Sequence, residues 1–151
     1  MDGLRNLGAL VGRILLVVIF LLSGFGKLTG PAGTMKMMAA HGIPIVHVAL
    51  VVTILIELGC GILVVIGYQA RWAALLVFLW FIPVTLIFHV AGYREAILNH
   101  QVQAAIIQQT MYLKNISILG GLLMLVAHGP GGWSIDGMRS HSLESATRRA
   151  A

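Results

Sequence analysis

Four long apolar stretches dominate the hydrophobic pattern of the chain, at about residues 7–28, 46–67, 72–90 and 112–128. Each approaches the roughly 20 residues that an α-helix needs to cross a hydrocarbon layer of about 30 Å. The pattern therefore predicts an all-α fold, an integral membrane four-helix bundle. An even number of spans puts both termini on one side of the membrane.

The connections between these spans differ in length. Residues 68–71 alone join the second and third spans, which predicts a tight antiparallel hairpin. On the opposite side, residues 32–41 predict a short helix that ends before Pro44, because proline disfavours helix in the residue before it. Apolar residues recur at helical spacing between positions 94 and 109, which predicts a helix lying on the membrane surface. We therefore expect short amphipathic helices in the outer loops.

Composition places the whole chain in the membrane class. Of its 151 residues, 58% are hydrophobic and 10% are charged, with a mean hydropathy of +0.93, which excludes an ordinary soluble protein. The formal charge of +5 comes from scattered basic residues without a basic stripe, so we expect no nucleic-acid partner. We expect one four-span membrane domain over residues 1–137 and a flexible C-terminal tail over 138–151.

Basic residues are distributed unequally between the two sides of the membrane. The outer loops carry Lys36 and Arg94, whereas six arginines lie on the side of the termini. These six are Arg5, Arg13, Arg71, Arg139, Arg148 and Arg149. Because cytoplasmic loops are enriched in Lys and Arg, the count predicts a multi-pass membrane protein with cytoplasmic termini. Counting Lys27 and Lys114 with the outer side narrows the margin to six against four.

Each span also contains ionisable or strongly polar residues, which are costly at membrane depth and usually face a bundle interior. The candidate site residues of this polar core are Arg13, Lys27, Glu57, His89, Lys114 and Asn115. Counting from the span ends places four of them at one outer level and Glu57 near mid-membrane. Arg13 approaches from the side of the termini. Snorkelling to the interface is the alternative explanation for Arg13 and the two lysines.

Three cations against one carboxylate leave this predicted core net positive, and His89 and Asn115 add further donors or acceptors. Such a core suits an anion, a carbonyl-bearing ring or an ordered chain of water. Cys60 is the only cysteine, so an intrachain disulfide and a cysteine-rich metal site are excluded. A haem site would need a second histidine facing His89 at the same depth, and we expect no metal site.

A set of short motifs is spaced along nearly the whole chain. They are Gly12-Arg13, Ser23-Gly24-Phe25-Gly26-Lys27, Gly42-Ile43-Pro44, Glu57-Leu58-Gly59, Phe88-His89, Leu113-Lys114-Asn115, and Gly-Pro-Gly-Gly-Trp-Ser-Ile-Asp at 129–136. In this order the motifs resemble those of the DoxX family of small four-span bacterial membrane proteins. The resemblance implies a four-helix membrane fold and a location in the bacterial inner (cytoplasmic) membrane. Some relatives in this family act as a subunit of thiosulfate:quinone oxidoreductase, and others work with membrane redox or oxidative-stress systems. Related four-span proteins assist assembly, so the resemblance implies a role of one of these kinds.

Three functions are compatible with these residues, and none of them assigns a catalytic residue. The first is an auxiliary subunit of a membrane redox complex, in which the lipid-embedded chain has no intrinsic cofactor and its pocket contacts a quinone. The second is a structural or assembly subunit that stabilises a larger membrane enzyme. The third is transport of protons or a small anion, which the lack of visible inverted repeats disfavours unless a homo-oligomer supplies the pathway. The sequence does not decide whether the chain is an enzyme.

Overall fold

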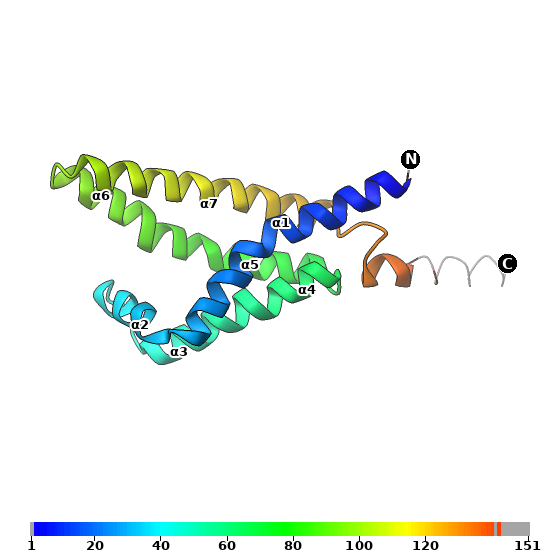
Figure 1. Cartoon of the computed structure of the whole chain (residues 1–151), viewed down its shortest axis with the longest axis horizontal. Coiled ribbons are helices and arrows are strands. Elements are labelled where there is room, and N and C mark those ends of the chain that lie inside the picture. The colour runs from blue at the N-terminus through cyan, green and yellow to red at the C-terminus, as the bar shows by residue number, and fades with distance from the viewer. Residues whose placement is uncertain (1, 141, 143–151) are drawn as a thin grey trace.

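The computed structural model describes residues 2–140 and 142. Within that part the chain is helical and forms no strand, and four helical segments are long and apolar enough to cross a membrane (Figure 1). The segments are α1 (Asp2–Thr29); α3 (Val46–Ile54) with η1 (Leu55–Cys60) and α4 (Gly61–Ile66); α5 (Ala70–Val84) with η2 (Thr85–Val90) and α6 (Ala91–Leu98); and α7 (Val102–His128). The predicted all-α membrane fold with four spans is confirmed.

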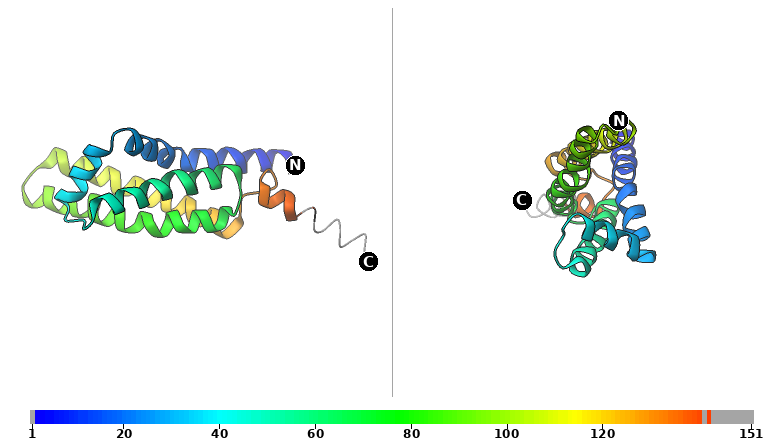
Figure 2. Two further views of the ribbon diagram at one scale, coloured as in Figure 1. Left: turned by 90° about the horizontal axis from the view of Figure 1, so that it is seen from below. Right: turned by 90° about the vertical axis from the view of Figure 1, so that its left-hand side faces the viewer.

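The long segments run lengthwise beside one another, and α1 begins at the same end of the bundle at which α7 finishes (Figures 1 and 2). Val17, Val64, Val77 and Leu122 come from the four segments and are fully buried in one core. Small residues permit close helix contacts, as is typical of membrane bundles. A Cβ atom at Gly24 would lie 2.8 Å from Cγ of Leu58, for example. The bundle therefore brings the polar positions of different spans close together.

The two connections at the end of the bundle opposite the N-terminus differ from each other. The first contains the expected short helix, α2 (Pro31–Ala40), which has proline at its start and is followed by a turn at Gly42 with φ +70°. The second does not contain the separate surface helix expected between residues 94 and 109. Instead α6 extends the third segment to Leu98, the chain turns over residues 99–101, and α7 begins at Val102.

Packing between α6 and α7 explains this correction. Ala96 and Ala105 are buried, and a Cβ atom at Gly92 would lie 3.1 Å from the side-chain amide carbon of Gln108. The apolar residues at helical spacing thus lie in the contact between two antiparallel helices. A single sequence with this spacing does not distinguish that contact from a contact with lipid.

Two spans contain a π-helical segment, and each segment holds a residue of the predicted polar core. Glu57 lies in η1 and His89 lies in η2. The second π segment, η2, begins two residues after Pro83, which has no backbone N–H for the helical ladder. The hydroxyl of Thr85 donates to the carbonyl oxygen of Phe81 at 2.8 Å. Such π segments occur frequently at functional sites, because they redirect side chains.

The segment after α7 folds back under the bundle. Residues 129–137, here called the C-terminal clasp, contact α1 and the turn before α5, and residues 135–140 are helical. The flexible tail predicted from residue 138 lies mainly outside the described residues. It stays a prediction for positions 141 and 143–151.

Candidate functional site

A cavity of about 290 Å³ lies within the half of the bundle away from the N-terminus, where the two π segments face α1, α2 and α7. Its polar lining comes from Ser23, Lys27, Thr34, Thr53, Glu57, His89, Lys114 and Asn115. Its apolar lining comes from Ile19, Phe20, Met37, Met38, Trp80, Phe81, Val84 and Phe88. Five of the six residues predicted from the sequence therefore line one cavity, and Arg13 does not.

Lys27 and Glu57 form an ion pair at the wall between α1 and η1. Nζ of Lys27 lies 2.8 Å from Oε2 and 3.0 Å from Oε1 of Glu57. The hydroxyl of Ser23 donates to Oε1 at 3.2 Å and accepts a hydrogen bond from Lys27. Glu57 is only 4% exposed, so its charge depends on these three contacts for compensation. Lys27 therefore reaches inward to Glu57 instead of snorkelling to the interface.

Asn115 links α7 to η2 at a second wall of the cavity. It is 2% exposed, and its amide nitrogen donates to the hydroxyl of Thr85 at 3.1 Å. Because that hydroxyl donates in turn to the carbonyl of Phe81, the orientation of the Asn115 amide is fixed. The amide oxygen and the second N–H remain as an acceptor and a donor for a bound molecule.

His89 is oriented by a residue that was not anticipated from the sequence. Nδ1 of His89 lies 2.9 Å from Oε1 of Gln108, and since an amide oxygen only accepts, Nδ1 carries the proton in this contact. The other ring nitrogen, Nε2, is left without this partner. Gln108 lies within the stretch that was expected to form a surface helix, so nothing in the apolar pattern placed it beside His89.

Two threonines near the cavity were not anticipated: Thr53, which lines it, and Thr85, which holds the amide of Asn115. Each lies four residues before a predicted site residue, Glu57 or His89, as Ser23 does before Lys27. Residues four apart share a helix face. That spacing is the signal that could have identified them.

Lys114 occupies an unusual position for a membrane lysine. It is exposed, and among the described residues its Nζ atom donates to Sδ of Met111 at 3.4 Å, a weak acceptor. It lines both the cavity and a neighbouring groove between α1 and α7. The groove also includes Gly12, Leu15, Leu16, Ile19, Ser117 and Ile118. The cation thus lies where the cavity meets the lipid-facing surface.

Arg13 lies near the other end of α1, and the expectation that it contributes to the same polar core is corrected. Fourteen residues separate it from Lys27, roughly 21 Å along a helix. It is 3% exposed, and its Nη2 atom donates to the carbonyl oxygen of Trp133 at 2.5 Å. Nε and Nη1 are buried without a hydrogen-bond partner among the described residues. Arg13 therefore holds the C-terminal clasp and does not reach Glu57.

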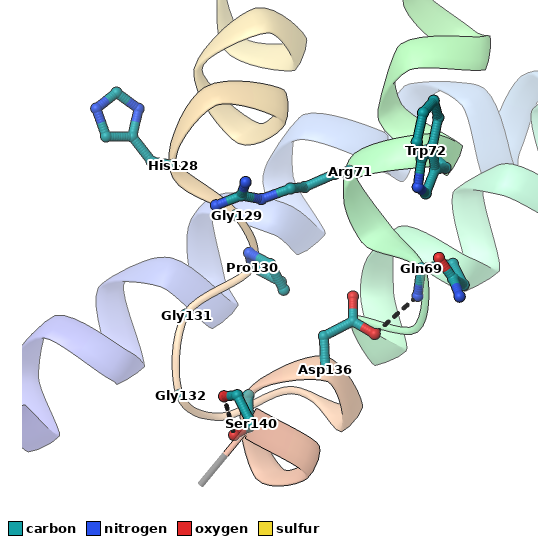
Figure 3. A pocket seen from close by; sticks show the side chains of 11 residues that line it. Gln69, Arg71, Trp72, His128, Gly129, Pro130, Gly131, Gly132, Asp136 and Ser140 are labelled. Carbon is teal, nitrogen blue, oxygen red and sulfur yellow. Dashed lines mark hydrogen bonds between the residues drawn. The ribbon is translucent and has the colours of Figure 1, made fainter. Parts of the chain in front are cut away.

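Other contacts fix the clasp against the bundle. The carboxylate of Asp136 accepts hydrogen bonds from the backbone nitrogens of Gln69 and Ala70, each at 2.9 Å. The backbone nitrogen of Asp136 donates to the carbonyl of Gly67 at 2.9 Å, and Gly132 N donates to Oδ1 of Asn6 at 3.0 Å. A separate cavity of about 470 Å³ opens beside the clasp (Figure 3).

Comparisons with known proteins place this architecture in a family. The chain matches DoxX over residues 8–90. It is 38% identical to inner membrane protein YqjF of Escherichia coli K12 over 138 residues, which cover 90% of this chain and 95% of the relative. It is 33% identical to inner membrane protein YphA of the same organism over 132 residues, covering 84% and 86%. No solved structure matches the chain significantly. The chain is an integral membrane protein that belongs to the DoxX family.

Proposed function

We propose that this protein is an auxiliary subunit of a quinone-linked redox complex in the bacterial inner membrane, and that its outer-half cavity binds the quinone head group. The observation that carries the proposal is the composition of the cavity wall, where polar groups from different spans surround an aromatic interior. A quinone head group is a flat ring with carbonyl oxygens on opposite sides, so it needs an apolar slot and donors on more than one wall.

The cavity offers both elements. Trp80, Phe81 and Phe88 supply flat apolar surface, against which a ring can stack. Lys114 and Asn115 on α7 supply N–H donors on one side. The Lys27 to Glu57 pair lies on another side, across α1 and η1. Hydrogen bonds from charged donors are about twice as strong as those between neutral groups, which favours carbonyl oxygens over a purely apolar guest.

The groove between α1 and α7 supports a guest that carries an apolar tail. It has a volume of about 470 Å³ and shares Ile19 and Lys114 with the cavity. Its other residues are apolar or small, so an isoprenoid chain could lie there while the ring occupies the cavity. A bilayer-soluble ligand would then enter from the side and place its polar head beside Lys114.

Binding can be tested by the fluorescence of Trp80, because the chain has three tryptophans and only Trp80 lines this cavity. The Trp72→Phe/Trp133→Phe variant isolates Trp80, and the Trp80→Phe/Trp133→Phe variant isolates the lipid-exposed Trp72 as a control. A short-chain ubiquinone analogue in nanodiscs should quench Trp80 saturably and Trp72 only in proportion to its concentration. Quenching that is unsaturable for both would remove the support for a quinone site.

Lys114 provides the matched test of specificity. In the Trp80 background, Lys114→Met should weaken saturable quenching by about tenfold, the size of one charged hydrogen bond of 1.5 kcal/mol. Lys36→Met is the control, because Lys36 is an exposed lysine on α2 outside the cavity. Equal affinities in the two variants would contradict the assignment of Lys114.

The role as an auxiliary subunit needs a separate experiment. A His89→Ala variant that accumulates to the normal level should lower quinone-dependent oxidase flux in native membranes, and gentle purification should recover a redox enzyme with the wild-type chain. The alternative is a structural or assembly subunit, which the closed Lys27 to Glu57 pair favours because buried ion pairs can fix helix register. That alternative predicts a lower level of the partner enzyme with no separate loss of flux per enzyme.

A further inference from the structure

A second cavity lies at the opposite end of the bundle and shares no residue with the first. It has a volume of about 470 Å³ and opens among the start of α5, the end of α7 and the C-terminal clasp (Figure 3). Its charged or titratable residues are Arg71, His128 and Asp136, and Trp72 stands at its border. None of these residues takes part in the proposed quinone site.

Arg71 is the cation of this cavity, and glycine at position 129 gives it room. The guanidinium lies over the loop at Gly129, as Figure 3 shows, and a Cβ atom there would lie 3.0 Å from Nε and 3.1 Å from Nη2 of Arg71. Gly129 also has φ +79°, a conformation that other residues rarely adopt. No acidic group in the described part of the chain lies within 4.0 Å of Arg71 to form an ion pair.

Asp136 does not neutralise Arg71, although both line the same cavity. Both oxygens of its carboxylate accept backbone N–H groups at the start of α5, from Gln69 and Ala70. These contacts compensate the carboxylate with the positive end of a helix. The positive charge of Arg71 therefore remains available to an anion that enters the cavity.

His128 adds a second basic group. Its Nδ1 atom lies 3.1 Å from the carbonyl oxygen of Met124, and since a carbonyl only accepts, Nδ1 is the donor. Nε2 remains free of that bond, and in the protonated imidazole it becomes a second donor toward an anion.

The cavity opens at the depth of lipid head groups. It lies where α5 begins at Ala70 and α7 ends at His128, at the edge of two membrane spans. Trp72 is 70% exposed beside it, and exposed tryptophans at span ends are typical of the head-group region. Basic pockets between spans at such a position bind anionic head groups.

We propose that this cavity binds the phosphate of an anionic phospholipid, with Arg71 as the charged donor, His128 at the rim, and Trp72 against the upper part of the acyl chains. The lipid would lie at the end of the bundle against which the C-terminal clasp packs. It is independent of the quinone proposal, because no residue or helix end is shared.

Native mass spectrometry of the full-length protein, stripped of lipid in mild detergent, tests the proposal. With phosphatidylglycerol and phosphatidylcholine added in equal amounts, the wild-type chain should retain about tenfold more phosphatidylglycerol. Arg71→Gln should abolish that preference, and Arg71→Lys, which keeps the charge, should restore part of it. Arg5→Gln is the control, because Arg5 is an exposed arginine on the same side and outside the cavity.

Each outcome bears on the proposal. Unchanged retention by Arg71→Gln would overturn it, and so would an equal loss in Arg5→Gln, which would assign the preference to overall charge. Inorganic phosphate at millimolar concentration should leave the lipid bound, whereas displacement would show a site for free phosphate. If Arg71→Gln does not fold, the wild-type lipid preference, the phosphate competition and the Arg71→Lys variant still decide the matter.

Discussion

At the scale of single residues, the buried charges of this protein make contacts between segments that are distant in the sequence. Glu57 has Lys27 and Ser23 as partners, and Arg13 has the carbonyl of Trp133. In both cases one side chain ties α1 to a segment far away in sequence. Because a buried charge without a partner is costly, these contacts make correct helix pairing a condition for stability.

The Lys27 to Glu57 pair should behave as a strongly coupled unit. Glu57→Gln or Lys27→Met alone removes one charge and leaves the other buried, so each should lower the free energy of unfolding by about 3 kcal/mol. The double variant Lys27→Met/Glu57→Gln should cost less than either single change, because no uncompensated charge remains. Unfolding of the purified protein in mixed micelles with increasing dodecyl sulfate measures all three. Additive effects of the two single variants would contradict the coupling.

Gly67 is a position at which one added Cβ atom should lower the stability of the fold. It has φ +71°, and a Cβ atom there would lie 2.1 Å from Nη1 of Arg13 and 3.1 Å from the backbone Cα of Ser134. Arg13 can move aside, but the backbone of the clasp cannot do so without breaking its contacts. Gly67→Ala should therefore lower the free energy of unfolding by about 3 kcal/mol, through backbone strain and overpacking.

The matched control for Gly67 is Gly120→Ala in α7. A Cβ atom at Gly120 meets nothing within 4 Å, and alanine favours helix over glycine by about 1 kcal/mol. This variant should be neutral or slightly more stable in the same unfolding assay. A loss of stability comparable to that of Gly67→Ala would show that the assay responds to any added methyl group.

At the scale of the elements, the groove between α1 and α7 determines which ligands reach the cavity. The two helices approach each other at Gly121, where a Cβ atom would lie 2.8 Å from Cδ1 of Leu16. Beside this contact, Ile118 lines the groove but not the cavity. A large side chain at position 118 should therefore obstruct a tail and leave the space for the head group unchanged.

Ile118→Trp tests whether the tail and the head group occupy separate spaces. Because the new tryptophan would add to the fluorescence of Trp80, binding is measured here by competition with a labelled quinone analogue. The variant should weaken binding of a long-chain quinone by about tenfold and leave a tail-less benzoquinone unaffected. Ile116→Trp is the control, because Ile116 is 54% exposed on the same helix and lines neither space. An equal loss for both ligands would argue against a tail in the groove, whereas no binding of either ligand to the wild type would argue against the quinone site itself.

At the scale of the whole molecule, the number of spans and the level of the polar residues along them were predictable, whereas the full helix lengths and the side-chain partners were not. Counting along the spans placed Lys27 and His89 at one level, and both line the same cavity. The partner of Arg13 could not be predicted, because the clasp returns to α1 across 120 residues of sequence. The contact between His89 and Gln108 depends on a π segment and on the α6 to α7 pairing, and a periodic pattern of apolar residues reveals neither.

The orientation of the bundle remains a prediction, and the structure clarifies which charges to count. Lys27 is neutralised by Glu57, Lys114 lies inside a span, and Arg13 is buried in α1, so none of them acts as a loop charge. The remaining basic residues number five on the side of the termini, Arg5, Arg71, Arg139, Arg148 and Arg149, against Lys36 and Arg94 on the other side. This excess predicts cytoplasmic termini.

Cysteine labelling in spheroplasts can measure this orientation, in a Cys60→Ser background that removes the only native thiol. Lys36→Cys on α2 should react with a membrane-impermeant maleimide added from outside. Tyr68→Cys, in the hairpin at the opposite end, should react only after the membrane is opened, because the loops with more positive charge remain in the cytoplasm. The reverse order of labelling would mean that charges within the spans outweigh those in the loops, and it would place the quinone cavity in the cytoplasmic half of the membrane and the proposed phospholipid site on the outer surface.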